Sequence, residues 1–241
     1  MKDLITAPWE LDPEGDVLLT LHNPKAPFAV WDDKWYEKTA SSRTEQPISR
    51  HQDSNIHEAD PQTQTIEPVK IEPELSTLDQ PISPSPTVQF ILSSKHLILA
   101  SEYFKNSLRG PWKEATSASS DGRRHVDAYD WDDDAMLLLM RIIHGHNYKV
   151  PYTITLETLA RLAVLVDYYQ CNEVVTVWLS IWLSRMTQPE HNSFGRDHIL
   201  WILVSWVFEK GPKFVNATRL AMEECPGELP TLGLPITNVA G

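Results

Sequence analysis

The fold is decided by residues 88–104, which have the sequence VQFILSSKHLILASEYF. The first five residues, Val88–Leu92, are rich in β-branched and aromatic side chains and predict a short strand. From Ser93 the apolar residues take the spacing of a helix that ends before Gly110–Pro111. The predicted apolar face of this helix consists of Leu97, Leu99, Ala100, Tyr103, Phe104 and Leu108. A strand that leads directly into an amphipathic helix predicts a sheet against which helices pack.

Two further strands and a series of helices are predicted on either side of this stretch. Gly15–Leu21 is a short apolar run between turn residues, and Arg123–Tyr129 alternates apolar with polar side chains. The predicted helices lie at about residues 130–144, 155–169, 172–182, 197–209 and 212–224. The order strand, strand, helix, strand, helices predicts the α+β class, with a small β-sheet covered by a cluster of α-helices.

A long insert separates the first two predicted strands. Residues 37–86 contain seven prolines, many Ser, Thr, Gln, Asp and Glu residues, and no aromatic side chain. Such a segment cannot bury enough apolar surface to offset its chain entropy, so we predict that it is disordered. It is either a solvated linker, which we favour, or a peptide ligand for another domain through its repeats Ile66–Pro68 and Ile71–Pro73.

The charge and the cysteine content disfavour several classes of protein. The 241 residues carry a formal net charge of -12, and a negative field repels the phosphates of nucleic acids and anionic lipids. We therefore expect no nucleic acid and no membrane among the partners. The two cysteines, Cys171 and Cys225, fit neither a disulfide framework nor a clustered zinc site. Without a signal peptide or an apolar run of about 20 residues, the sequence predicts an intracellular protein of the nucleus or cytoplasm.

Five motifs in chain order resemble the BTB/POZ family, including its fungal branch. They are Gly15–Leu19, Phe90–Phe104 with its basic pair and "Leu-Ala-Ser" followed by "Tyr-Phe", Ile142–His146, Leu159–Cys171 and Trp178–Leu183. The resemblance implies a BTB/POZ-like domain over residues 14–186, interrupted by the insert. Residues 187–225 are then expected to form a C-terminal helical extension, and residues 226–241 a flexible tail.

This resemblance implies a protein-binding domain that forms homo- or heterodimers. In some members the domain recruits a cullin-type ubiquitin ligase scaffold or a transcriptional corepressor. The element associated with cullin contact, a hydrophobic residue two positions before an acid, is not found between His146 and Thr155, which leaves that partner open. We expect a non-enzymatic adaptor that binds a partner protein. The alternative is a transcription-linked or ubiquitin-ligase-linked regulator in which the acidic Pro-rich insert is the ligand segment.

Four residues are the candidates for contact with a partner protein: Asp16, His96, Tyr103 and Phe104. Asp16 and His96 match family positions that form a charged pair in the dimer pocket of transcription-factor members. A buried pair of this kind would raise the pKa of the imidazole. We favour the alternative, in which Asp16 caps the entry to its strand and His96 is a half-exposed helix residue. Tyr103 and Phe104 are candidates as aromatic residues of the "Tyr-Phe" position.

No catalytic, cofactor or metal site is predicted. The acids among residues 130–134 lack the spacing of a calcium loop and favour a helix N-terminus, and His144 and His146 favour a helix C-terminus over a metal site. Cys171 follows an amphipathic helix and is expected in the core, since no activating group adjoins it. Four tryptophans at helical spacing are expected mainly in the core, with partner contact as the alternative. They are Trp178, Trp182, Trp201 and Trp206.

Overall fold

The strands predicted on either side of the insert pair with each other in one sheet. The computed structural model describes residues 7–32, 34, 86–109, 121–186, 194–225 and 229–236. Within them, β2 (Val17–His22) runs antiparallel to β3 (Thr87–Leu92). β4 (Arg124–Tyr129) is parallel to β2 on its other side, and the two-residue β1 (Trp9–Glu10), which we did not predict, is parallel to β3. The order is β1-β3-β2-β4, so the sheet is mixed.

One face of this sheet belongs to the core, and side chains along its strands therefore alternate between buried and partly exposed. Val17, Leu19 and Leu21 of β2 are buried, whereas the residues between them are partly exposed. The neighbouring strands add Phe90 and Val126 to the same buried set. Burial of each large aliphatic or aromatic side chain contributes roughly 1.5–3 kcal/mol, so this face requires helices above it.

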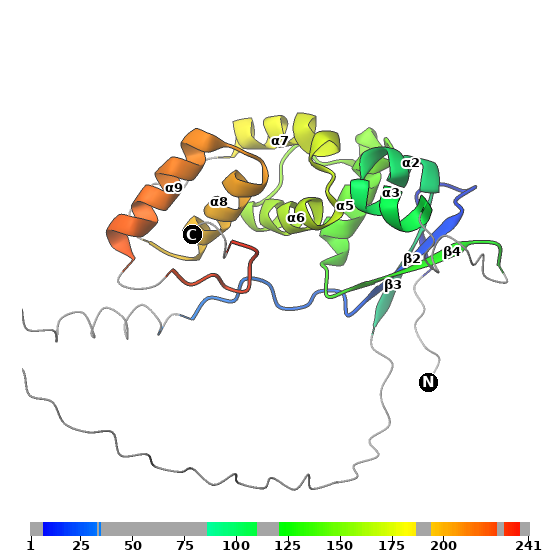
Figure 1. Cartoon of the computed structure of the whole chain (residues 1–241), viewed down its shortest axis with the longest axis horizontal. Helices are drawn as coiled ribbons and strands as arrows, with labels where there is room; N and C mark the ends of the chain where they lie inside the picture. The colour runs from blue at the N-terminus through cyan, green and yellow to red at the C-terminus, as the bar shows by residue number, and fades with distance from the viewer. Residues whose placement is uncertain are drawn as a thin grey trace, which may run out of the picture.

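Helices supply that cover and extend beyond it. Figure 1 shows the sheet at one end of the molecule, with α2, α3 and α5 beside it and α6 to α9 extending away from it. The helices are α2 (Ser94–Ala100), α3 (Glu102–Arg109), α5 (Asp133–Ile143), the 3₁₀ turn η1 (Asn147–Lys149), α6 (Leu156–Tyr169), α7 (Asn172–Arg185), α8 (Arg196–Val207) and α9 (Gly211–Glu224). The described residues therefore have the predicted α+β class.

Two of the helices begin at side-chain caps. Thr155 accepts a hydrogen bond from the backbone N–H of Thr158 at the start of α6. Asp132 accepts one from the N–H of Ala135 at the start of α5. We predicted that α5 would begin at Asp130, but that residue has a φ of 62°, in the left-handed region, so the helix begins later.

The single helix predicted after Ser93 is in fact two helices, α2 and α3. Ser101 lies between them with an extended backbone, φ -139° and ψ 124°. Its hydroxyl donates a hydrogen bond to the carbonyl of Tyr169 at the end of α6 and accepts one from the N–H of Phe104. The prediction of a continuous helix was wrong because this contact comes from a residue distant in the sequence.

The C-terminal part of the described chain packs on the rest of the molecule. α8 lies against α6, and α9 lies against α8. Residues 229–236 differ from the predicted flexible tail, since Leu234 and Ile236 are buried in the common core. The predicted insert at residues 37–86 lies outside the described residues except for Pro86. None of the helices in the described ranges combines the length and apolar character that a membrane span needs.

Candidate protein-interaction site

Asp16, the first of the predicted contact residues, positions the start of α2. Its carboxylate accepts hydrogen bonds from the backbone N–H of Ser94 at 2.8 Å and from the Ser94 hydroxyl at 2.7 Å. Burial raises the pKa of Asp16, but the hydrogen bonds from Ser94 outweigh this effect and hold the pKa below its ordinary value. Asp16 therefore caps a helix, where we had expected it to cap the entry to its strand.

His96, the second candidate, is exposed on α2 and lies against another histidine. Its ring centroid is 5.1 Å from that of the buried His144. His144 bonds to the carbonyl of Met140 through Nδ1 at 2.8 Å and to the N–H of Ser93 through Nε2 at 3.0 Å. Among the described residues no hydrogen bond or ion pair joins His96 to Asp16, so the charged pair of the resemblance is not formed within this chain.

Tyr103 and Phe104 belong to an aromatic cluster between α3 and α6. Phe104 is 0% exposed and stacks on Tyr169 with ring centroids 4.8 Å apart. Tyr103 is half-buried and contacts both Tyr169 and Tyr168 through its ring. Phe104 is therefore a core residue, and the hypothesis that it contacts a partner is wrong. Only part of the surface of its neighbour Tyr103 is exposed for contact with a partner.

A groove opens where the α2–α3 pair meets the turn between α6 and α7. The floor forms at the break between α2 and α3, where the N–H of Glu102 donates to the carbonyl of Gln170 at 3.4 Å. Gln170 has a φ of 51°, in the left-handed region, which ends α6 and directs the chain into α7. The groove has a volume of about 620 Å³, which is large enough for several side chains of a partner segment.

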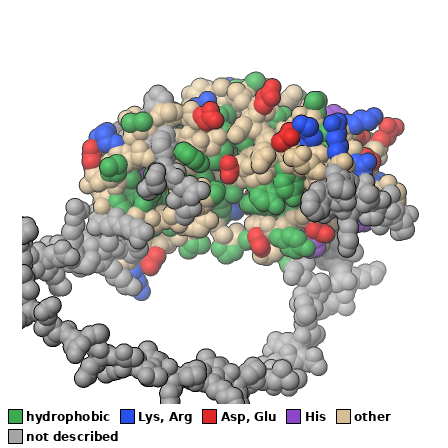
Figure 2. Space-filling view, in the orientation of Figure 1, with side chains coloured by type: hydrophobic (Ala, Val, Ile, Leu, Met, Phe, Trp, Pro, Cys, Tyr) green, Lys and Arg blue, Asp and Glu red, His purple; other side chains and the backbone are tan. Residues whose placement is uncertain are grey.

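The walls of this groove combine basic side chains with an exposed leucine. Lys95, Lys105 and Arg109 line it, together with Glu173 and with Glu102, which pairs with Lys105 at 2.9 Å. Figure 2 shows Lys and Arg side chains gathered at the end of the molecule that carries α2 and α3. Leu99 on the same wall is 88% exposed. We predicted Leu99 on the buried face of its helix, which was wrong.

A signal for this surface was present in the sequence. Leu97, Ile98 and Leu99 are three consecutive aliphatic residues, although an amphipathic helix buries only one face. In the structure Leu97 is buried, Ile98 is half-buried and Leu99 points to solvent. Leu99 is therefore one aliphatic residue more than the buried face needs, and it lies two positions before Ser101, where the helix breaks. Together these two features indicate the groove.

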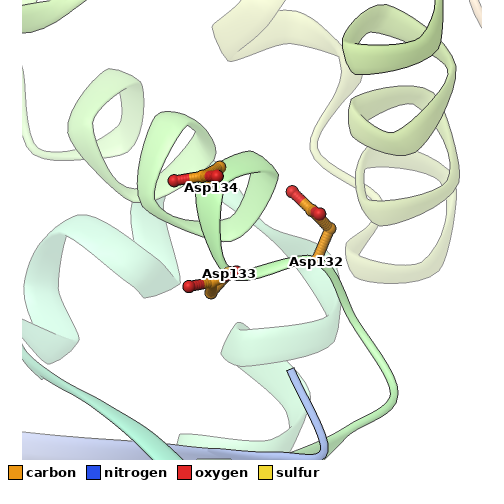
Figure 3. Close-up of side chains that lie close together, drawn as sticks. All are labelled: Asp132, Asp133 and Asp134. Carbon is orange, nitrogen blue, oxygen red and sulfur yellow. The ribbon is translucent and has the colours of Figure 1, made fainter. Parts of the chain in front are cut away.

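The acidic residues at the start of α5 serve the helix. Figure 3 shows Asp132, Asp133 and Asp134, whose carboxylate oxygens lie within 4.8 Å of one another. Asp132 caps the helix through one oxygen, and its other oxygen accepts a hydrogen bond from Arg161 at 3.2 Å. Acids in the first turn of a helix interact favourably with its dipole. The predicted role as a helix N-terminus is confirmed.

The remaining candidates lie mostly in the core. Cys171 is buried, and burial raises the pKa of its thiol to about 12, so the group stays protonated at neutral pH. Trp178, Trp182 and Trp201 are buried, as the stripe predicts, whereas Trp206 on α8 is exposed. Among the described residues, the hydrogen bond of the Cys171 thiol goes to the carbonyl of Val166 and to no base. The groove beside α2 combines a concave shape with cations and an exposed leucine.

No family model matches the chain, and no curated protein matches it.

Proposed function

We propose that the chain is a non-enzymatic adaptor of the BTB/POZ type that binds a partner protein. The order of elements supports the fold part of this proposal. The chain forms two paired strands, then a pair of short helices, a third strand and successive helices. The motifs that carry the resemblance lie along the chain in this order. The binding surface in this proposal is the groove between the α2–α3 pair and the α6–α7 turn.

The exposed Leu99 beside that groove is the observation that carries the proposal. A large aliphatic side chain that is open to solvent beside a concave surface offers apolar area that a partner can cover. Lys95 and Arg109 on the walls are cations in a chain whose net charge is -12, so they favour an acidic partner segment. The partner would place an apolar side chain against Leu99 and carboxylates near the two cations.

A matched pair of surface variants tests this proposal. Leu99→Asp puts a charge at the groove, and Met222→Asp puts the same charge at a residue of α9 that is 85% exposed. Proteins bound to the full-length chain in its own cells are compared quantitatively for wild type and both variants. Circular dichroism and thermal melting establish that both variants fold, as expected for changes at exposed positions.

The proposal requires that Leu99→Asp removes at least one specific partner. Once that partner is purified, its affinity for the variant should be lower by roughly tenfold or more, as for an interface hot spot. Met222→Asp should retain the same partner. A partner set that both variants retain, or that both lose, contradicts the assignment of the groove.

The same assay separates the alternative in which the acidic Pro-rich insert is the ligand segment. Residues 37–85 are replaced by a Gly-Ser linker of equal length, which keeps the number of residues between the described positions 34 and 86 unchanged. Partner binding that survives this replacement supports the groove. Binding that is lost with the insert but retained by Leu99→Asp supports the alternative.

A further inference from the structure

β4 lies at one edge of the sheet, and half of its backbone groups point away from β2. The N–H groups of Arg124 and of Asp130, just after the strand, donate to carbonyls at the two ends of β2, at 2.9 and 3.0 Å. Because alternate residues of a strand bond to the same neighbour, the backbone groups of His125, Asp127 and Tyr129 point outwards. Within the described ranges no strand lies beyond them.

The side chains of these outward residues share one exposed face. His125 and Asp127 are 46% and 57% exposed, and Tyr129 is exposed as well. Each of the first two has a partner within the chain, since His125 contacts Asp121 at 3.1 Å and Asp127 contacts His22 at 2.8 Å. An edge strand with free backbone groups is a template for a further strand.

We propose that this edge is a self-association surface, on which β4 of a second copy pairs antiparallel with β4. The occupant follows from the charge pattern. In the register centred on Val126, His125 lies opposite Asp127 of the second copy, and the symmetry of the pair repeats this contact. An imidazole donates a hydrogen bond to a carboxylate when neutral and adds an opposite charge when protonated.

The backbone geometry agrees with the same register. Residues that point outwards on both strands then lie opposite each other, and each such pair exchanges two N–H···O=C bonds. A register centred on Asp127 would instead place two carboxylates directly opposite, which is unfavourable. Charged side chains on an edge also disfavour pairing with unrelated strands. This surface shares no residue with the groove beside α2, so it stands apart from the proposed partner site.

Reciprocal exchange of the two charged residues tests the proposal. His125→Asp places like charges opposite each other between copies, and Asp127→His removes both opposite pairs. The double variant H125D/D127H restores them. Within one chain the double exchange does the reverse, because it sets the new carboxylate beside Asp121 and the new imidazole beside His22. Effects within the chain and between copies therefore have opposite signs in the double variant.

The mass of the full-length chain is measured by light scattering and sedimentation over about a hundredfold range of concentration. Wild type should form a dimer, each single variant should raise the dissociation constant about tenfold, and the double variant should return to within about threefold of wild type. Circular dichroism establishes that all variants fold. Wild type that stays monomeric, single variants that dimerise like wild type, or a double variant weaker than either single one would overturn the proposal.

Discussion

His144 links the end of α5 to the start of α2. With Nε2 accepting from the N–H of Ser93, the ring is neutral, and protonation would place a second donor against that N–H. Burial lowers the pKa of His144 below its ordinary value. The hydrogen bond to Met140 and the charge of Asp12 raise the pKa, whereas His96 and His146 lower it further.

The protein should therefore lose stability as the pH falls below about 6.5, the ordinary imidazole value, because the unfolded chain binds a proton at His144 that the folded chain does not. The free energy of unfolding should therefore be lower at pH 5.5 than at pH 7.5. His144→Gln keeps an acceptor for Ser93 without a titrating ring and should reduce this dependence. Urea unfolding at the two pH values measures it. An equal pH dependence in His144→Gln and wild type contradicts this role of His144.

At the scale of elements, Arg196 joins three segments that are distant in the sequence. It begins α8, donates to Glu157 at the start of α6 at 3.1 Å, and donates to the carbonyls of Ala29 and Phe28 at 2.8 and 3.3 Å. Glu157 also accepts hydrogen bonds from Arg161 of the same helix. The hydrogen bond from Arg161 has the largest effect on the pKa of Glu157 and lowers it. Together with the hydrogen bond from Arg196, it holds this pKa below its ordinary value, although burial raises it.

Arg196→Lys should destabilise the chain by about 1–2 kcal/mol, because an ammonium cannot hold a carboxylate and two carbonyls in the geometry of a guanidinium. The same exchange at Arg219, whose pair with Glu223 is exposed, should cost less than about 0.5 kcal/mol. Urea unfolding of both variants at pH 7 compares them. Equal stabilities would show that α8 is held on the molecule by its apolar face alone.

Most of the elements could be predicted from the sequence because local patterns determine them. The alternation of β2, the strand β3 and the Thr155 cap all depend on residues close in the chain. The break at Ser101 could not, since it depends on a hydrogen bond to Tyr169. β1 has only two residues and no pattern of its own, and burial of Leu234 is decided by packing on distant segments.

The candidate site was predicted less well than the fold, for the same reason. A sequence pattern indicates that a helix has a buried face, and it does not specify which residues lie at a junction of four helices. Phe104 and Asp16 were candidates for partner contact; Phe104 instead lies in the core, and Asp16 caps α2. Leu99 was predicted in the core and lines the groove.

At the scale of the whole molecule, two surfaces differ in chemistry. The groove beside α2 is lined by three cations, two acids and an exposed leucine, whereas the edge of β4 carries a histidine and an aspartate in a pattern that complements itself. A net charge of -12 keeps copies of the chain apart at long range, so association at either surface depends on local complementarity. Added salt should therefore weaken partner binding at the groove and leave pairing of backbone groups at β4 less affected.

The most direct test of partner binding is to place a photoreactive side chain in the groove. Leu99→p-benzoylphenylalanine and, as the matched control, Met222→p-benzoylphenylalanine are introduced into the full-length chain in its own cells and irradiated. The account predicts a covalent adduct with a partner protein from position 99 that is absent from position 222. Adducts from position 222 alone, or from neither position, would contradict it.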